Sequence, residues 1–276
     1  MTAKVYAVVN RKGGVGKTTT AVSLAHGLTL AGPYRVLLVD LDPQGNCATA
    51  LGLKTNGRPD IAELLVGSAS LKDVIIPADR EGTGGPKRDN LFVIPSSDKL
   101  ERAKKKLVAQ AALAAIDADM GGDNVALDDI FLVRLAPVTK VFDYIIFDCP
   151  PSLDSFSTAV YAAATGAIVP VKTDFLGANG TAQHTDNIVE AQANGLKIKI
   201  AAVVPTFYRP REVLARQIMT SLKKRYGARV VTPIPQSVQV EQSPAASGQT
   251  IHEYAPDSPA AAAYMNLVQF ILKDKS

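Results

Sequence analysis

The sequence predicts an α/β fold in which a doubly wound, mainly parallel sheet is flanked by helices on both faces. Short β-branched and apolar runs without polar alternation recur along the chain, and such runs are typical of strands buried on both sides. Helical stretches separate most of these runs, an order that favours parallel strands. The expected strands cover residues 5–10, 36–40, 91–95, 144–148, 167–171, 198–204 and 230–234.

The chain is long and apolar enough to bury one large core. Its 276 residues, 47% of them hydrophobic, are expected to form a single domain over residues 1–276. The two cysteines, Cys47 and Cys149, are too few for a disulfide framework and favour a reducing cytoplasm. No apolar run is long enough to span a bilayer, so we expect no integral membrane association. A net charge of +4 does not identify a partner by itself.

The first expected helix follows the first strand after a glycine-rich turn. Apolar residues between positions 21 and 28 recur at i, i+3, i+4 and i+7, which is one helix face, and Gly32 with Pro33 ends it. Two polar stretches, residues 79–90 and 117–124, are expected to be insertions away from the chemistry, the first of them a surface loop.

The glycine-rich turn has the composition of a triphosphate-binding loop. Glycines let backbone N–H groups turn towards anionic oxygens, and a helix N-terminus lies behind them. Lys17 is expected to neutralise the β and γ phosphates, and the Thr18 hydroxyl to ligate Mg²⁺. A plain glycine turn between strand and helix is the alternative, but it would not require the full run. The phosphate-binding residues expected here are Lys12, Gly13, Gly14, Val15, Gly16, Lys17, Thr18 and Thr19.

Lys12 is unusual, because an ordinary phosphate loop needs no lysine immediately before its glycines. A second cation at this place is expected to point away from Lys17 or towards the phosphate of another molecule. The alternative is a solvated surface lysine.

Carboxylates end two of the expected strands. Asp40 and Asp42 follow the run at residues 36–40, and Asp148 ends the run at residues 144–148. A carboxylate at the tip of a buried strand is costly unless it meets a cation, and Mg²⁺ prefers few carboxylates with several waters. An aspartate that caps the next turn is the alternative for Asp148. We expect Cys149, which follows it, to be a packing residue rather than a nucleophile.

Three motifs carry a family resemblance. The segment RKGGVGKTTTAVSLA resembles the deviant Walker A motif of the ParA/MinD family, DLDPQ is similar to its switch I, and DCPPS is similar to its Walker B and switch II. In that family two subunits sandwich two ATP molecules, so the resemblance implies a homodimer in which Lys12 reaches the partner's nucleotide. It also implies that Asp42 orients or polarises the attacking water.

The same resemblance supplies the remaining site roles. The implied enzyme is a slow, Mg²⁺-dependent ATPase with the catalytic residues Lys12, Lys17 and Asp42. The implied metal site consists of Thr18, Asp40 and Asp148, with the two aspartates acting through the water shell of the ion. Adenine contacts are expected around Phe207 and at Pro235 and Gln236. ATP and Mg²⁺ are therefore the expected cofactors.

A basic segment follows in the second half, where the chain is similar to ParA and Soj almost to its end. Its cations are typical of a surface that binds a phosphate backbone without sequence preference, although a solvated helix face is the alternative. Gln236 and Gln239 stand where nucleoid-binding members carry arginines, which weakens the prediction. The candidate DNA-binding residues are Arg209, Arg211, Arg216, Lys223, Lys224 and Arg225.

The leading functional hypothesis is an ATPase that positions or segregates a cargo in the cytoplasm, on the nucleoid, and responds to a ParB-like or other adaptor protein. The cargo could be a plasmid, a chromosome locus or a protein assembly. The chain begins its first strand at Val5, so no N-terminal helix-turn-helix extension is expected.

Three other classes share parts of this pattern. A membrane-associated spatial regulator of the MinD type is the alternative function, but the C-terminal segment MNLVQFILKDKS does not resemble that branch's basic amphipathic helix. A reductase of the nitrogenase iron-protein type would need a cysteine pair at the dimer axis, which Cys47 and Cys149 do not evidently provide. A bacterial tyrosine kinase would need a C-terminal tyrosine cluster, and only Tyr254 and Tyr264 lie near the end.

Overall fold

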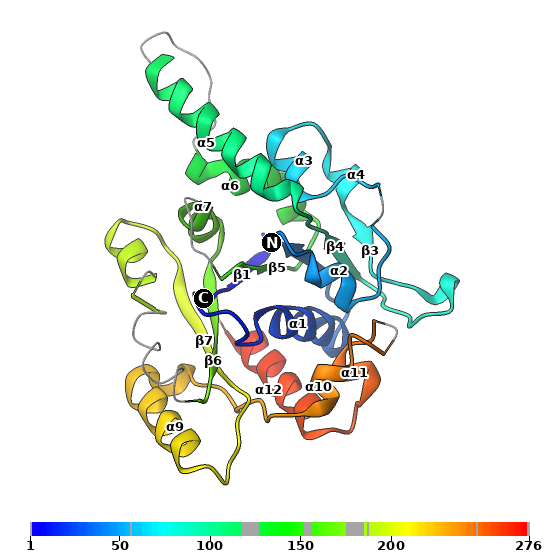
Figure 1. The fold of residues 1–276 in the computed structure, drawn as a ribbon, viewed down its shortest axis with the longest axis vertical. Helices are drawn as coiled ribbons and strands as arrows, with labels where there is room; N and C mark the ends of the chain where they lie inside the picture. The colour runs from blue at the N-terminus through cyan, green and yellow to red at the C-terminus, as the bar shows by residue number, and fades with distance from the viewer. Residues whose placement is uncertain are drawn as a thin grey trace.

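A seven-stranded sheet runs through the centre of the computed structural model, which describes residues 2–55, 57–117, 127–151, 156–174, 185–186, 188–246 and 248–274 (Figure 1). The strand order is β3-β4-β2-β5-β1-β6-β7, and every neighbouring pair is parallel except β3 with β4. The strands are β1 Lys4–Val8, β2 Val36–Asp40, β3 Ile76–Pro77, β4 Leu91–Ile94, β5 Tyr144–Asp148, β6 Gly166–Lys172 and β7 Lys199–Thr206. The predicted doubly wound sheet is confirmed.

Helices cover both faces of the sheet, as predicted (Figure 1). One layer contains α1, α11 and α12, and the other contains α3, α5, α6 and α7. The helices are α1 Lys17–Ala31, α2 Asn46–Ala50, α3 Ile61–Val66, α4 Leu71–Val74, α5 Lys99–Asp117, α6 Ile130–Leu135, α7 Phe156–Ala163, α9 Val213–Tyr226, α10 Val238–Gln242, α11 Ile251–Tyr254 and α12 Pro259–Lys273. The predicted end of the first helix at Gly32 is confirmed, since α1 has Gly32 as its C-cap.

Alternate residues of each central strand enter different halves of the core. In β1, Val5 and Ala7 pack with the α3, α5, α6 and α7 layer, while Tyr6 and Val8 pack with the α1 and α12 layer. Successive side chains of a strand point to opposite faces, so a strand covered on both sides must be apolar at every position. This explains why the strands appear in the sequence as unbroken apolar runs.

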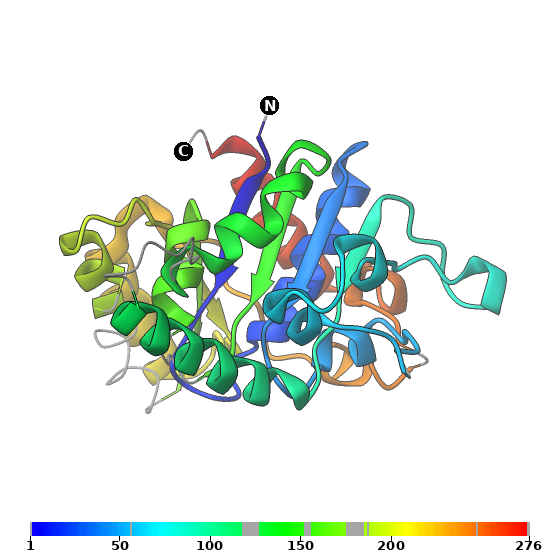
Figure 2. The ribbon, with the colours of Figure 1, turned by 90° about the horizontal axis from the view of Figure 1, so that it is seen from above.

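The strand register determines where the candidate site residues lie. Asp40 at the end of β2 is level with Asp148 at the end of β5, and Val8 at the end of β1 is level with the same Asp148. Figure 2 shows both chain termini at one end of the sheet, and β1 runs from there to the loop at the other. The functional residues that follow β1, β2 and β5 therefore meet at one edge.

The prediction of a strand at residues 230–234 is wrong. This segment runs beside β7 and makes only isolated bridges, Val203 with Val230 and Tyr208 with Pro235. Pro233 and Pro235 have no backbone N–H to donate to a ladder, so the segment cannot continue as a regular strand. It is still anchored by two hydrogen bonds that it donates, from Val231 N to Val203 O and from Ile234 N to Pro205 O.

The stretch at residues 79–90 departs from the prediction at one residue. Most of it is exposed, but Arg88 is buried, with 2% of its surface accessible. Its guanidinium makes a bidentate ion pair with Glu253, at 2.8 and 2.9 Å, and donates to Leu51 O and Gly248 O. The loop is therefore fastened to the C-terminal half. Of the second predicted insertion, residues 118–124 lie outside the described residues.

We expect Arg88→Met to lower the free energy of unfolding by about 3–5 kcal/mol, because the mostly buried Glu253 carboxylate would lose its cation. Lys87→Met is the matched control, since the Lys87 side chain is 57% exposed and pairs with Asp89 at the surface. Its effect should stay below about 1 kcal/mol. Denaturant unfolding of both variants measures the difference, and similar small changes would show that the buried pair does not hold the loop.

Candidate functional site

The loop between β1 and α1 is held open by glycines and anchored to neighbouring strands. Gly14 and Gly16 have φ angles of 68° and 85°, a left-handed region that favours glycine, and Gly16 is the N-cap of α1. Thr206 at the end of β7 donates its hydroxyl to Val15 O at 2.9 Å. Asn10 donates its amide to Pro170 O in β6 at 2.6 Å. The chain thus presents a fixed helix N-terminus at the strand ends, the arrangement that binds phosphates.

The two lysines of this loop lie differently. Lys17 is buried, its ammonium donates to Lys12 O at 3.1 Å, and burial lowers its pKa. The Lys12 ammonium instead forms an ion pair with Asp174 at 3.3 Å, with 26% and 36% of the two side chains exposed. Asp174 also pairs with Lys172 at 3.2 Å. The side chain of Lys12 therefore leaves its own loop, one of the directions expected from the sequence.

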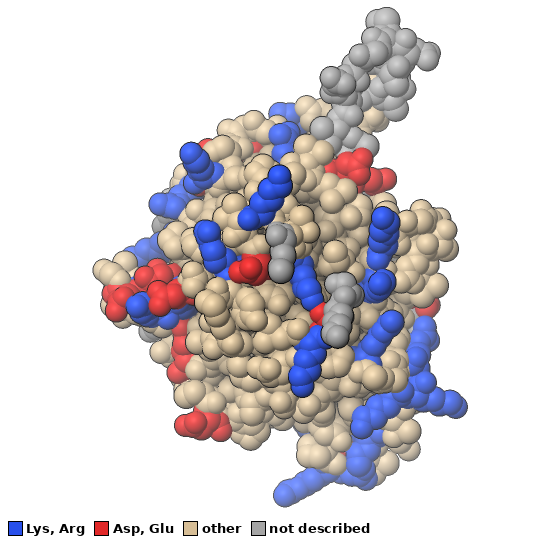
Figure 3. All heavy atoms as spheres, turned by 180° about the vertical axis from the view of Figure 1, so that it is seen from behind, with Lys and Arg blue, Asp and Glu red and all other residues tan. Residues whose placement is uncertain are grey.

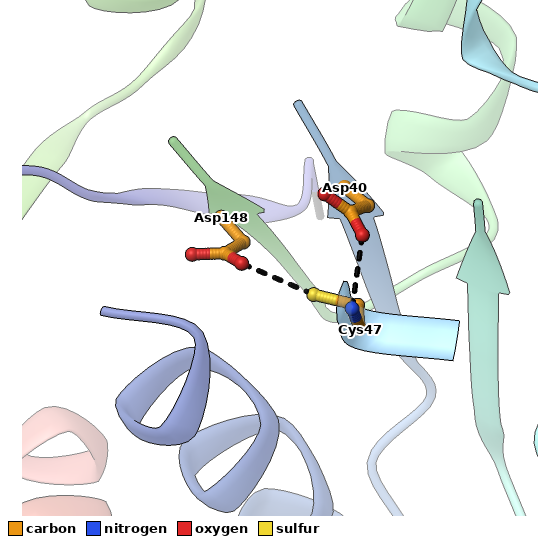
Figure 4. A group of neighbouring side chains, drawn as sticks. All are labelled: Asp40, Cys47 and Asp148. Atoms are coloured by element: carbon orange, nitrogen blue, oxygen red, sulfur yellow. Dashed lines mark hydrogen bonds between the residues drawn. The ribbon is translucent and has the colours of Figure 1, made fainter. Parts of the chain in front are cut away.

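Asp40, Cys47 and Asp148 form a buried cluster behind the loop (Figure 4). The backbone N–H of Cys47, in the first turn of α2, donates to Asp40 Oδ2 at 3.0 Å. The Cys47 thiol donates to Asp148 Oδ2 at 3.3 Å. All three residues have no accessible surface. The cluster joins the ends of β2 and β5 to α2.

The two carboxylates of this cluster are electrostatically strained. Burial, and for Asp40 also the charge of Asp148, raises the pKa of both groups above the ordinary range. Within the described part of the chain, Asp148 Oδ1 is buried without a hydrogen-bond partner. Thr18, in the first turn of α1, lies close enough to Asp148 that its hydroxyl lowers the pKa of that carboxyl. An unsatisfied carboxylate oxygen beside a hydroxyl suits a hydrated Mg²⁺ ion, so the residues present fit this metal.

Asp42 lies just outside the buried cluster. Its backbone N–H donates to Asp40 Oδ1 at 3.0 Å, and its own carboxylate accepts from the N–H of Gln44 at 3.0 Å. The side chain is partly exposed, in contrast to that of Asp40. The turn holds the two aspartates in different environments.

A pocket beside the loop is lined by two of the three residues predicted to contact adenine. Phe207, with a φ of 52°, and Pro235 line it, whereas the exposed Gln236 accepts a hydrogen bond from Arg209. Sequence reasoning missed several lining residues, because α10 and α12 bring them in from far along the chain. The lining consists of Gly16, Thr19, Thr206, Phe207, Ile234, Pro235, Ser237, Val240, Glu241 and Tyr264.

The predicted basic residues lie on α9 and its flanks, where Figure 3 shows Lys and Arg gathered at one corner of the molecule. Arg216 and Lys223 are seven residues apart on the exposed side of α9, opposite its buried face. Arg209 pairs with Glu212 at 2.7 Å and Arg225 with Asp186 at 3.2 Å, which partly neutralises these two. In the part of the chain that the structure describes, Lys223 and Lys224 have no ion pair.

The C-terminal segment forms a helix that packs against the core. Residues of α12, including Tyr264, Leu267 and Val268, are buried against α1. Among the described residues, no helix combines the length and apolar character needed to span a bilayer.

The loop, the buried aspartates and the strand order together define a nucleotide-binding protein of the P-loop class. A family model described as an AAA domain matches residues 3–201. The chromosome-partitioning ATPase Soj of Thermus thermophilus is 33% identical, over 96% of this chain and 94% of its own. The chromosome partitioning protein ParA of Caulobacter vibrioides is 30% identical, over 98% and 94%.

Comparison with solved structures shows the same fold over nearly the whole chain. Cobyrinic acid a,c-diamide synthase from Mycobacterium smegmatis, with a bound ATP analog and magnesium, is similar with a TM-score of 0.76 and 27% identity. The similarity covers 98% of this chain and 95% of that one. The chain belongs to the ParA/Soj family of P-loop ATPases.

We expect Asp148→Asn to raise the free energy of unfolding of the nucleotide-free protein by roughly 1–3 kcal/mol, because it removes a buried, partly unsatisfied charge. The variant should lose the stabilisation that Mg²⁺ and ATP give the parent, about 3 kcal/mol at a hundredfold excess over Kd. Thermal unfolding with and without Mg²⁺ and ATP measures both effects. Asp143→Asn, an exposed change just before β5, is the control. Destabilisation of nucleotide-free Asp148→Asn would contradict the strain described above.

Proposed function

We propose that this chain is a slow, Mg²⁺-dependent ATPase that dimerises when it binds ATP and positions or segregates a cargo on nonspecific DNA. The observation that carries the proposal is the placement of two lysines by one loop: Lys17 folds back onto it and Lys12 turns out of it. The family and its chromosome-partitioning members support the same function.

ATP would be held by the loop residues 12–19, with its adenine beside Phe207 and Pro235. The pocket next to Gly16 supports this placement, since it opens directly beside the helix N-terminus that would face the phosphates. We do not assign an adenine contact to the Gln236 side chain, because it is exposed and accepts a hydrogen bond from Arg209. An adenine bound here would lie between side chains at the end of β7 and side chains of α10.

Mg²⁺ would be held by the Thr18 hydroxyl and, through waters, by Asp40 and Asp148. When bound, it would neutralise charge on the phosphates during hydrolysis. Asp148 Oδ1, which has no partner, would accept a hydrogen bond from one of those waters. Asp42, more exposed than Asp40, would orient the attacking water.

Lys12 would make dimerisation depend on ATP. Its ion pair with Asp174 is partly exposed, and such pairs contribute only about 0–1 kcal/mol. A charge-assisted hydrogen bond to a phosphate is stronger, so the ammonium would exchange Asp174 for a nucleotide held by a second subunit. The γ-phosphate would then stabilise the dimer directly.

The dimer would bind DNA through α9 and its flanks, and a ParB-like or other adaptor would stimulate hydrolysis to release it. Exposed cations on one helix face bind the phosphate backbone without reading sequence. The site of action would then be the nucleoid in the cytoplasm.

We expect Lys12→Gln to abolish ATP-dependent dimerisation and Asp42→Ala to preserve it while lowering turnover by about 10²-fold, the usual scale for losing a group that positions or activates water. Size-exclusion chromatography with ATP, together with phosphate release, measures both. Arg11→Gln, an exposed cation next in the chain, is the matched control and should dimerise normally. Dimerisation of Lys12→Gln at the parent's ATP concentration would remove the trans role of Lys12.

We expect Arg216→Glu with Lys223→Glu to abolish DNA retention in ATP without changing unstimulated ATPase activity. If both residues contact phosphates, their loss should reduce the slope of log affinity against log salt by roughly two. Arg102→Glu with Lys105→Glu makes the same charge change on the exposed side of α5 and serves as the control. Equal losses in both double variants would mean that net charge, and not this surface, determines binding.

A further inference from the structure

Cys47 gives the buried cluster a ligand that a magnesium site does not need. Mg²⁺ is a hard cation that takes oxygen ligands and retains waters, so a thiol contributes nothing to it. Yet the Cys47 sulfur lies 3.3 Å from Asp148 Oδ2, and the backbone of the same residue is bonded to Asp40. The thiol thus points to Asp148, while the backbone N–H of the same residue points to Asp40 (Figure 4).

We propose that Asp40, Cys47 and Asp148 form a site for a thiophilic divalent cation such as Zn²⁺ in the nucleotide-free protein. One ligand atom from each residue lies within 4.8 Å of the others. Tetrahedral Zn²⁺ with bonds of about 2.3 Å to sulfur and 2.1 Å to oxygen separates its ligands by roughly 3.4–3.6 Å. The thiol and Asp148 already have nearly this separation, and the other ligand pairs, at up to 4.8 Å, need to contract by about 1.4 Å at most.

A second observation points to a cation ligand in this cluster. Among the described residues, the fully buried Asp148 Oδ1 has no hydrogen-bond partner, although its other oxygen accepts from the thiol. Two buried carboxylates beside each other repel, and a divalent charge offsets both. Binding replaces the thiol proton, which leaves to solvent, so that Cys–SH and Zn²⁺ give Cys–S–Zn⁺ and H⁺.

A cavity of about 260 Å³, lined in part by α1 and α2, lies near the cluster. Its lining includes Thr18, whose hydroxyl acts on Asp148, and Asn46, the chain neighbour of Cys47. The three cluster residues themselves are fully buried and do not line it. Because Zn²⁺ would use the same aspartates as the proposed Mg²⁺ site, the two ions would exclude each other. That exclusion rests on the proposed function, whereas the cysteine site does not.

The test is a Co²⁺ titration of the nucleotide-free full chain in buffer without thiols or chelators. Thiolate coordination gives an intense sulfur-to-cobalt charge-transfer band, and four-coordinate Co²⁺ gives strong visible bands. We expect both in the parent protein, loss of the charge-transfer band in Cys47→Ala, and retention in Cys149→Ala. Cys149 is the matched control, because it is the other buried thiol and is adjacent to Asp148 in the chain. Zn²⁺ should displace the bound Co²⁺.

Absence of the charge-transfer band in the parent, or its persistence in Cys47→Ala, would overturn the proposal. Thermal unfolding of Cys47→Ala checks that its core is intact, and Cys47→Ser provides a second variant of nearly the same size. The titration contains no nucleotide, so its failure is distinguishable from failure of the ATPase proposal. If both proposals hold, adding Mg²⁺ and ATP should reduce the band.

Discussion

Parallel register is the constraint on which the site depends. The pairing of β5 with both β1 and β2 places Val8, Asp40 and Asp148 at one level, where the P-loop begins. The carboxylates are buried because the strands that carry them are covered on both faces. A sheet covered on both faces therefore buries two carboxylates, Asp40 and Asp148, at the ends of its strands, where a cation would stabilise them.

The loop between β1 and α1 holds its two lysines, Lys17 and Lys12, in different ways. Lys17 donates to Lys12 O and is held at the place where phosphates would bind, and burial there lowers its pKa. Lys12 is held by a weak, partly exposed ion pair. A tightly held Lys17 and a loosely held Lys12 are what a nucleotide-dependent switch requires, because only the second must change partners. Asp42 is likewise more accessible than Asp40, so it is the aspartate that can meet water without a change in the buried cluster.

The sequence predicted the features that depend on neighbouring residues. Apolar runs located the central strands, helical spacing located α1, and the aspartates at strand ends located the acidic edge. Features that depend on distant segments were missed. Arg88 is buried only because Leu51, Gly248 and Glu253 meet around it. Nothing local predicted the pairing of Lys12 with Asp174 or the approach of Val240 and Tyr264 to the pocket. The error at residues 230–234 arose because the apolar content was given more weight than Pro233 within the segment and Pro235 directly after it.

ATP-dependent dimerisation, as proposed, depends on a contact between Lys12 and a phosphate held by a second subunit. The most direct measurement is the crystal structure of the complex with Mg²⁺ and a non-hydrolysable ATP analogue, and the position of Lys12 Nζ within it. We expect a dimer in which this nitrogen has left Asp174 and lies within hydrogen-bond distance of a phosphate oxygen bound to the other subunit. A nucleotide-loaded chain whose Lys12 is still paired with Asp174, or faces solvent, would contradict it.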